Sequence, residues 1–452
     1  MHKPATFVSA TALLIALGGQ AAFAQDLIHP IGEGDFNWDN YEAFAAAHDF
    51  TGETINVTGA TTGDDANRYR NLYAYFTAAT GANVEYSGSE SFEQDIVIAS
   101  QAGGLPDVAL FPQPGLAKDL AANGTLVPVA EPEFMIENYA AGSSWRDLGT
   151  FPGEDGESNV FGLFFGTDLK SLVWYSPEQF DEGGYDIPQT QEELMALSQQ
   201  IVEDGGTPWC IGLGSGAATG WPATDWVEDM MLRTASLEVY DQWVAHEIPF
   251  NDERVVAAIE AYGSYALVPE FTPAGPEVVA TTDFRDSPDG LFSFPPECYM
   301  HRQASFIPIF FPEGVVAGED YDFFYFPPFE ANADLGRPLL GSGGLASQTN
   351  NNPVTDAFMA FLGTPFAHEI MMSQGQFLSP HNDANLDIYT SDTQRQLGEI
   401  LVNATSFRFD GSDLMPGEIG TNAFWTGMVD YTTGADAQSV ADAIEARWQS
   451  IQ

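Results

Sequence analysis

Basic residues are scarce in this chain of 452 amino acids. Lysine and arginine together number 14 against 65 aspartates and glutamates, which gives a formal net charge of −51 at pH 7. A protein that binds nucleic acid neutralises phosphates with clustered lysine and arginine, so this composition excludes nucleic acid as a partner. An acidic surface of this kind keeps a protein soluble by self-repulsion and does not identify its ligand.

Long hydrophobic runs are absent after the first residues of the chain. A basic start and an apolar run over residues 10–17 precede Ala22, Phe23 and Ala24, which follow the small-x-small rule for signal peptidase. No later segment approaches the roughly 18 to 20 uninterrupted apolar residues of a membrane span. We therefore expect a signal peptide over residues 1–24, cleavage after Ala24, and a periplasmic protein without membrane insertion.

Cysteine occurs only twice, at Cys210 and Cys298. Both positions follow the predicted signal peptide, and an even number of cysteines in an oxidising compartment indicates one disulfide. A zinc site at Cys298 and His301 would need two further ligands at suitable spacing, and the sequence does not offer them. We therefore expect a disulfide, no metal site and no cofactor.

The sequence also lacks the local motifs of several enzyme classes. His368 and Glu369 begin like the zinc motif HExxH, but Met372 stands where the second histidine must be. Neither the nucleophile elbow GxSxG nor the phosphate-binding loop GxxxxGK[ST] occurs. The paired carboxyls that glycoside hydrolysis needs arise by composition alone among 65 acids. We expect no enzymatic activity, and a secreted carbohydrate-active enzyme, a glycoside hydrolase, is the alternative.

Three successive β–loop–α units are expected in the part of the chain that follows the signal peptide. Their strands are expected at residues 53–60, 83–86 and 103–111. In an open α/β sheet, the loops at the carboxyl ends of the strands meet at one edge, where ligands bind. Short polar side chains in such loops can bond to hydroxyl groups, although turn formation explains each of them equally well. The candidate ligand contacts in these loops are Gly63, Asp64, Ser89, Glu90 and Gln113.

Residues 209–229, WCIGLGSGAATGWPATDWVED, combine flexible backbone with indoles and a carboxylate. Glycine lets the backbone approach a ligand closely, and Trp221 and Trp226 offer flat apolar faces with one polar edge each. Asp225 and Glu228 are spaced as a capping box that opens an amphipathic helix. Because a sugar has apolar faces and polar rims, we predict ligand contacts at Trp221, Asp225 and Trp226. Buried indoles and a simple helix cap are the alternative.

Several stretches resemble the solute-binding proteins of ABC sugar importers. Residues 103–108 (GGLPDV) are similar to a signature of this family, and residues 167–180 resemble the strand that carries the chain into the second lobe. Residues 415–448 resemble the end of the maltose-binding group. Together with residues 209–229, this pattern is most similar to the α-glucoside-binding subgroup. The resemblance covers nearly all of the chain after the signal peptide, except residues 28–50.

The resemblance implies the α/β fold of a two-lobed periplasmic binding protein of type II, with discontinuous lobes and a three-crossing hinge. The first lobe would comprise residues 25–166 and 341–379, and the second lobe residues 167–340 and 380–452. In this family the ligand lies between the lobes, and the closed form is recognised by a membrane permease that an ATPase drives.

The resemblance also implies the ligand and the partners. It implies an α-glucoside or similar small oligosaccharide as ligand, ABC permease subunits as partners, and a monomer. Another polyol or a compatible solute is the alternative ligand. Lys170 lies at a predicted crossing and could donate to a hydroxyl, although a salt bridge is an equal alternative. Gly343 and Gly344 could present backbone N–H groups to a ligand or simply form a bend. Trp425 stands at the position of the family's stacking tryptophan, and packing in a helical core is the alternative.

Overall fold

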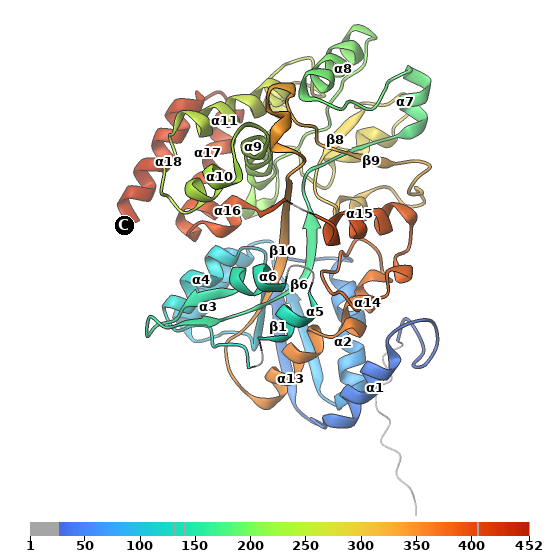
Figure 1. Cartoon of the computed structure of the whole chain (residues 1–452), viewed down its shortest axis with the longest axis vertical. Helices are drawn as coiled ribbons and strands as arrows, with labels where there is room; N and C mark the ends of the chain where they lie inside the picture. The colour runs from blue at the N-terminus through green and yellow to red at the C-terminus, as the bar shows by residue number, and fades with distance from the viewer. Residues whose placement is uncertain (1–26, 131, 140–141, 405, 452) are drawn as a thin grey trace, which may run out of the picture.

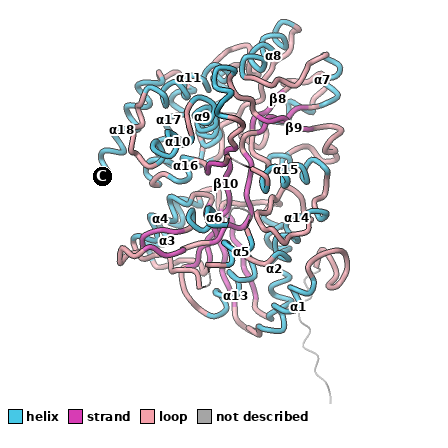
Figure 2. The backbone as a smooth tube through the Cα atoms, viewed as in Figure 1, coloured by secondary structure: helices cyan, strands magenta, loops and turns pink. Residues whose placement is uncertain are grey.

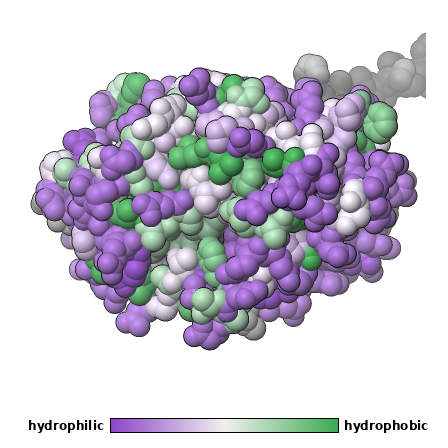
Figure 3. All heavy atoms as spheres, turned by 90° about the horizontal axis from the view of Figure 1, so that it is seen from above, coloured by the Kyte–Doolittle hydropathy of each residue, from purple (hydrophilic) through white to green (hydrophobic). Residues whose placement is uncertain are grey.

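The computed structural model describes residues 27–130, 132–139, 142–404 and 406–451, and it shows two lobes joined by long strands (Figure 1). The predicted signal peptide and its cleavage site lie outside these residues. Within the described ranges, no helix is both long and apolar enough to cross a bilayer. Figure 3 shows hydrophilic residues over most of the face that is seen from above, with hydrophobic residues in small groups between them.

The first lobe is built on a six-stranded mixed sheet. Its strands are β1 (Thr54–Gly59), β2 (Asn83–Gly88), β3 (Val108–Phe111), β6 (Leu163–Leu169), β10 (Leu339–Gln348) and β11 (Phe407–Phe409). β1 pairs in parallel with β2 and β3, whereas β10 runs antiparallel to β3 and β6. Because parallel neighbours need crossover connections, helices separate β1, β2 and β3 in the chain. The three predicted β–loop–α units are confirmed.

Helices cover this sheet. They are α1 (Trp38–Ala47), α2 (Ala66–Thr80), α3 (Phe92–Ala102), α4 (Pro114–Ala122), α5 (Phe134–Asn138), α6 (Gly142–Leu148), α13 (Pro353–Leu362) and α14 (Pro365–Met372). A small hairpin of β4 (Thr150–Pro152) and β5 (Ser158–Val160) lies beside them. In α2, Leu72, Tyr73 and Phe76 are buried, as helical periodicity predicts. α1 packs against α2 and α14, so the segment outside the family resemblance belongs to this lobe.

The second lobe has a small antiparallel sheet and most of the remaining helices (Figure 1). The strands are β7 (Leu172–Tyr175), β8 (Met300–Arg302) and β9 (Asp322–Tyr325), with β7 in the middle. The helices of the remaining chain are α7 (Pro177–Gly183), α8 (Gln191–Glu203), α9 (Trp221–Thr234), α10 (Leu237–Val244), α11 (Glu253–Ala266), α12 (Pro276–Val279), α15 (Asp392–Val402), α16 (Gly411–Leu414), α17 (Trp425–Thr432) and α18 (Ala437–Ile451). α9 packs against α11 and α17 and forms the centre of this lobe.

Strands β6 and β10 run side by side between the lobes (Figure 2). An isolated bridge joins Thr167 in β6 to Leu378, so a third segment lies at the same level. The mixed α/β fold with two discontinuous lobes is therefore as expected. The exact lobe boundaries near residues 167, 341 and 380 remain predictions.

The helix after the glycine-rich loop, residues 210–220, begins earlier than the sequence indicated. α9 starts at Trp221 with Gly220 at its N-cap position, where φ is 115°. Asp225 therefore lies in the second turn, and the predicted capping box with Glu228 is wrong. Glycine tolerates this left-handed conformation, which lets the chain turn sharply into the helix.

α9 is also buried on every side rather than amphipathic. Residues 222–233 are all buried, so their charged side chains must find partners inside the protein. Asp229 forms ion pairs with Arg233 at 2.7 Å and with Arg302 at 2.9 Å. A helix at the centre of a lobe contacts neighbours on every side, so it has no polar face toward solvent. The predicted amphipathic pattern of this helix is therefore wrong.

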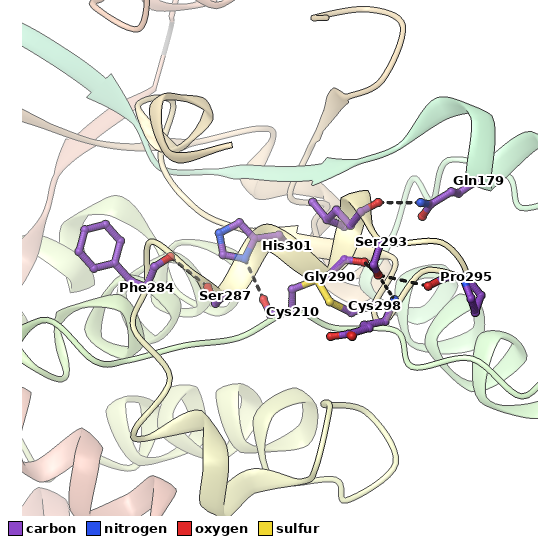
Figure 4. The surroundings of a disulfide bond; sticks show 11 residues. Gln179, Cys210, Phe284, Ser287, Gly290, Ser293, Pro295, Cys298 and His301 are labelled. Atoms are coloured by element: carbon purple, nitrogen blue, oxygen red, sulfur yellow. Dashed lines mark hydrogen bonds between the residues drawn. A yellow bond between two sulfur atoms is a disulfide. The ribbon is translucent and has the colours of Figure 1, made fainter. Parts of the chain in front are cut away.

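The predicted disulfide between Cys210 and Cys298 is confirmed, with the two Cα atoms 5.4 Å apart (Figure 4). It joins the start of the glycine-rich loop to the segment that leads into β8. The imidazole of His301 lies beside the bridge, and its Nδ1 is 2.8 Å from the carbonyl oxygen of Cys210. The bridge therefore anchors the loop that precedes α9.

Candidate functional site

A cavity of about 310 Å³ lies between the two lobes. The loops after β1, β2 and β3 line it from the first lobe, and the glycine-rich loop, the start of α9 and the segment around Phe284 line it from the second lobe. β6 and β10 contribute the hinge side. The cavity is at the small end of the range of about 300 to 1,000 Å³ that small-molecule sites occupy.

Eight of the twelve predicted ligand contacts line this cavity. They are Glu90, Gln113, Lys170, Trp221, Asp225, Gly343, Gly344 and Trp425. Gly343 and Gly344 lie in β10, where the pairing with β6 shifts register between Gly343 and Leu345. A strand that loses its regular pairing leaves backbone groups free for other bonds.

The other four predicted contacts, Gly63, Asp64, Ser89 and Trp226, lie outside the residues that line the cavity. The Ser89 hydroxyl donates to Asp95 Oδ2 at 2.6 Å and accepts the amide of Ser91, which is turn chemistry. Trp226 is only 1% exposed, and its ring packs 5.3 Å from that of Trp209. The loop that contains Gly63 and Asp64 does reach the cavity, through Thr61, Thr62 and Asp65.

A buried charge network forms the second-lobe floor of the cavity. Lys170, at the end of β6, donates to Asp225 Oδ1 at 2.8 Å and to Asp410 Oδ2. The other oxygen of Asp410 accepts from Ser412 Oγ at 2.8 Å and from the amide of Asp413 at 3.0 Å. The lysine ammonium therefore holds β6, α9 and the start of α16 together.

Burial and mutual charge set the protonation of this network. Burial alone would lower the pKa of Lys170, but Asp225 and Asp410 raise it well above its usual 10.5, so the ammonium stays charged at neutral pH. Burial raises the pKa of Asp225, and burial together with Asp410 raises the pKa of Glu228. Burial alone would raise the pKa of Asp410, but the adjacent Lys170 lowers it below its usual value. One cation thus faces several buried carboxyls, and the pKa values of Asp225 and Glu228 lie above their usual range.

The same carboxylates could surround a metal ion, because oxygen atoms of Asp225, Glu228 and Asp410 lie within 4.8 Å of one another. Lys170 already donates to two of the three residues, so its ammonium supplies the positive charge that they need. Calcium prefers six to eight oxygen ligands, which this cluster does not supply. We assign no metal ion to it.

Three buried polar atoms on residues that line the cavity have no hydrogen-bond partner among the described residues. They are Gln113 Oε1, Asp225 Oδ2 and Trp425 Nε1. A buried polar atom without a partner costs about 1 to 3 kcal/mol, so such atoms in a binding cavity indicate groups that bond to a ligand. Two acceptors and one donor, placed on both lobes, match a molecule that carries several hydroxyl groups.

An aromatic wall stands next to these atoms. Trp221 is partly exposed to the cavity, and its ring packs edge-on against Phe284 with centroids 5.0 Å apart. Lys170 Nζ lies 5.4 Å from the centre of the Trp221 ring. An indole face beside hydrogen-bonding groups is suited to the C–H face of a sugar ring.

Several cavity residues were not predicted from the sequence. Asp168 lies in β6 with its pKa raised to about 6, chiefly by burial. Asp168 is two residues from Lys170, and side chains two residues apart in an extended chain point to the same face. This spacing could therefore have marked Asp168 as a cavity residue. Arg285, Asp410 and Asp413 also line the cavity, but no local pattern marked them.

Acidification is expected to destabilise the second lobe through His301. Burial lowers the pKa of this imidazole from 6.5 to about 4, so the folded protein keeps it neutral while the unfolded chain takes up a proton. Stability is therefore lost as the pH falls from about 6.5 toward 4. In His301→Gln, urea titrations across this window should show a pH slope that is smaller by up to about 1.4 kcal/mol per pH unit. An unchanged slope would assign the dependence to another group.

The fold and the interlobe cavity are those of a solute-binding protein. The chain belongs to the family of bacterial extracellular solute-binding proteins, whose family model matches residues 59–365. It is 54% identical to the alpha-glucosides-binding periplasmic protein AglE of Rhizobium meliloti, over 95% of this chain and 94% of that protein. It is 43% identical to the osmoprotective compounds-binding protein GgtB of Synechocystis, over 87% of this chain and 92% of that protein.

Solved structures show the same fold at low sequence identity. The bacterial solute receptor AcbH superimposes with a TM-score of 0.75 at 17% identity, over 88% of this chain and 99% of that one. The solute-binding protein RafE in complex with raffinose gives a TM-score of 0.68 at 14% identity, over 88% and 99% of the two chains.

Proposed function

We propose that this protein binds an α-glucoside or a similar small oligosaccharide in the interlobe cavity and delivers it to the permease of an ABC importer. The observation that carries the proposal is the set of unpaired buried atoms on Gln113, Asp225 and Trp425 beside the exposed face of Trp221. The R. meliloti relative is 54% identical to this chain, and its name refers to alpha-glucosides. This likeness supports an α-glucoside as the ligand.

The protein acts by binding, without covalent chemistry. A ligand that contacts Gln113 in the first lobe and Asp225 in the second stabilises the closed arrangement, because only that arrangement satisfies both contacts. The closed monomer in the periplasm is then the form that the permease recognises. Lys170 orients Asp225 at the cavity floor and opposes the burial that raises the pKa of this carboxyl.

A compatible solute is the second candidate ligand. It is favoured by the likeness to the Synechocystis protein, whose name refers to osmoprotective compounds. A glycosylated polyol such as glucosylglycerol has one sugar ring for the Trp221 face and a short hydroxylated tail. Competition between glucosylglycerol and an α-linked disaccharide, followed by calorimetry, ranks the two candidates directly.

Recovery of the ligand separates binding from hydrolysis. The protein is incubated with the tightest-binding sugar, and the sugar is then released by denaturation and chromatographed. We expect intact sugar in one-to-one amount. Progressive appearance of monosaccharide would favour the glycoside hydrolase instead.

Trp221→Ala is expected to weaken sugar binding by about 1 to 3 kcal/mol, because the apolar face of the ring loses its stacking partner. Trp221→Phe keeps part of that face and should lose less. Calorimetry gives the dissociation constants, and urea unfolding checks stability in parallel. Unchanged affinity together with lower stability would assign the indole to packing alone.

A further inference from the structure

An ion pair spans the cavity between the lobes. Arg285 Nη2 lies 3.7 Å from Glu90 Oε1, and both residues line the cavity. Glu90 belongs to the first-lobe loop between β2 and α3, whereas Arg285 belongs to the second-lobe segment between α12 and β8. The side chains of this pair are 57% and 29% exposed, compared with 6% for Lys170 at the floor. The pair therefore lies at the solvent side of the cavity.

Arg285 is held in this position by its own lobe. Its amide donates to Asp283 Oδ1 at 2.9 Å, and its guanidinium pairs with Asp283 Oδ2 at 3.2 Å and lies 4.5 Å from the centre of the Phe284 ring. The segment is fastened to the glycine-rich loop, since the amide of Phe284 donates to the carbonyl of Gly214 at 2.9 Å. Figure 4 shows Phe284 near the disulfide, in the loop that the bridge between Cys210 and Cys298 closes. The cation is thus presented to the opposite lobe by a fixed support.

Glu90 meets the second lobe at another point as well. A β-carbon added to Gly216, in the glycine-rich loop, would lie 3.7 Å from Glu90 Oε2. The Glu90 carboxylate therefore faces second-lobe backbone as well as the guanidinium, while its side chain stays exposed to solvent. The cavity behind it is small, at about 310 Å³.

We propose that the Glu90–Arg285 pair closes the outer end of the cavity and favours short saccharides over longer ones, consistent with a cavity at the small end of the usual range. A longer saccharide must pass between the two side chains and break the pair. The pair is thus a specificity-determining device for ligand length. This inference rests on the proposed function.

The test compares an α-linked glucose series of two, three and four rings by calorimetry. The proteins are the wild type, Glu90→Gln, Arg285→Gln and the double variant that carries both changes. The control is Arg254→Gln, which removes a surface ion pair with Asp252 outside the cavity.

The wild type should bind the disaccharide more tightly than the tetrasaccharide. Each single cleft variant should reduce the ratio of the two dissociation constants by about two- to fivefold, the range that an exposed ion pair contributes. The double variant should reduce the ratio no further than either single variant, because both changes remove the same pair, and Arg254→Gln should leave it unchanged.

The inference is overturned if the wild type does not discriminate by length, if the single variants keep its ratio, or if the effects of the two single variants add in the double variant. Failure of every protein, including the wild type, to bind any saccharide would instead overturn the proposed function. The two failures are therefore distinguishable.

Discussion

Lys170→Met is expected to lower the free energy of unfolding by about 3 to 5 kcal/mol, the usual cost of removing one partner from a buried ion pair. Lys170 is 5% exposed and pairs with Asp225 and Asp410, which are each 1% exposed. Without the ammonium, both carboxyl groups stay buried and lose the cation that donates to them. Urea unfolding at pH 8 measures the loss.

The matched control is Lys118→Met, since Lys118 is exposed on α4 and is the only other lysine after the predicted signal peptide. It should change stability little. The deficit of Lys170→Met should also shrink as the pH falls from 8 to 6, because burial already raises the pKa of Asp225 and a protonated carboxyl needs no cation. A deficit below about 1 kcal/mol at pH 8 would contradict the network described above.

Replacing both Cys210 and Cys298 with serine is expected to cost about 4 to 5 kcal/mol, because the bridge closes a loop of 88 residues and restricts the unfolded chain. The closed loop carries Trp221, Phe284 and Arg285, so sugar affinity should fall as well. Urea unfolding of the wild type and the double variant measures the first effect, and calorimetry measures the second.

Reduction provides the internal control for this prediction. A reductant should bring the wild type to the stability of the double serine variant and should leave that variant unchanged. Equal stability of the oxidised and reduced wild type would show that the bridge does not stabilise the fold.

Local sequence patterns predicted the parts of the site that depend on neighbouring residues. Polar loops after successive parallel strands must meet at one sheet edge, which brought Glu90 and Gln113 to the cavity. The disulfide followed from cysteine number and compartment. The loop between β1 and α2 was also located, although Thr61 and Thr62 line the cavity rather than Gly63.

Long-range contacts account for what the sequence did not reveal. Asp410 meets Lys170 across 240 residues of chain, and no local spacing marks such a partner. Arg285 reaches Glu90 only because two separate lobes approach each other. Trp226 illustrates the same limit, since an indole in a helix buried on every side has the same local sequence signal as one that faces a ligand.

Calorimetric titration of the wild-type protein with trehalose, sucrose, maltose and glucosylglycerol tests the central claim most directly. We predict saturable binding of at least one of these compounds at one site per chain. Folded, oxidised protein that binds none of the four would contradict the account.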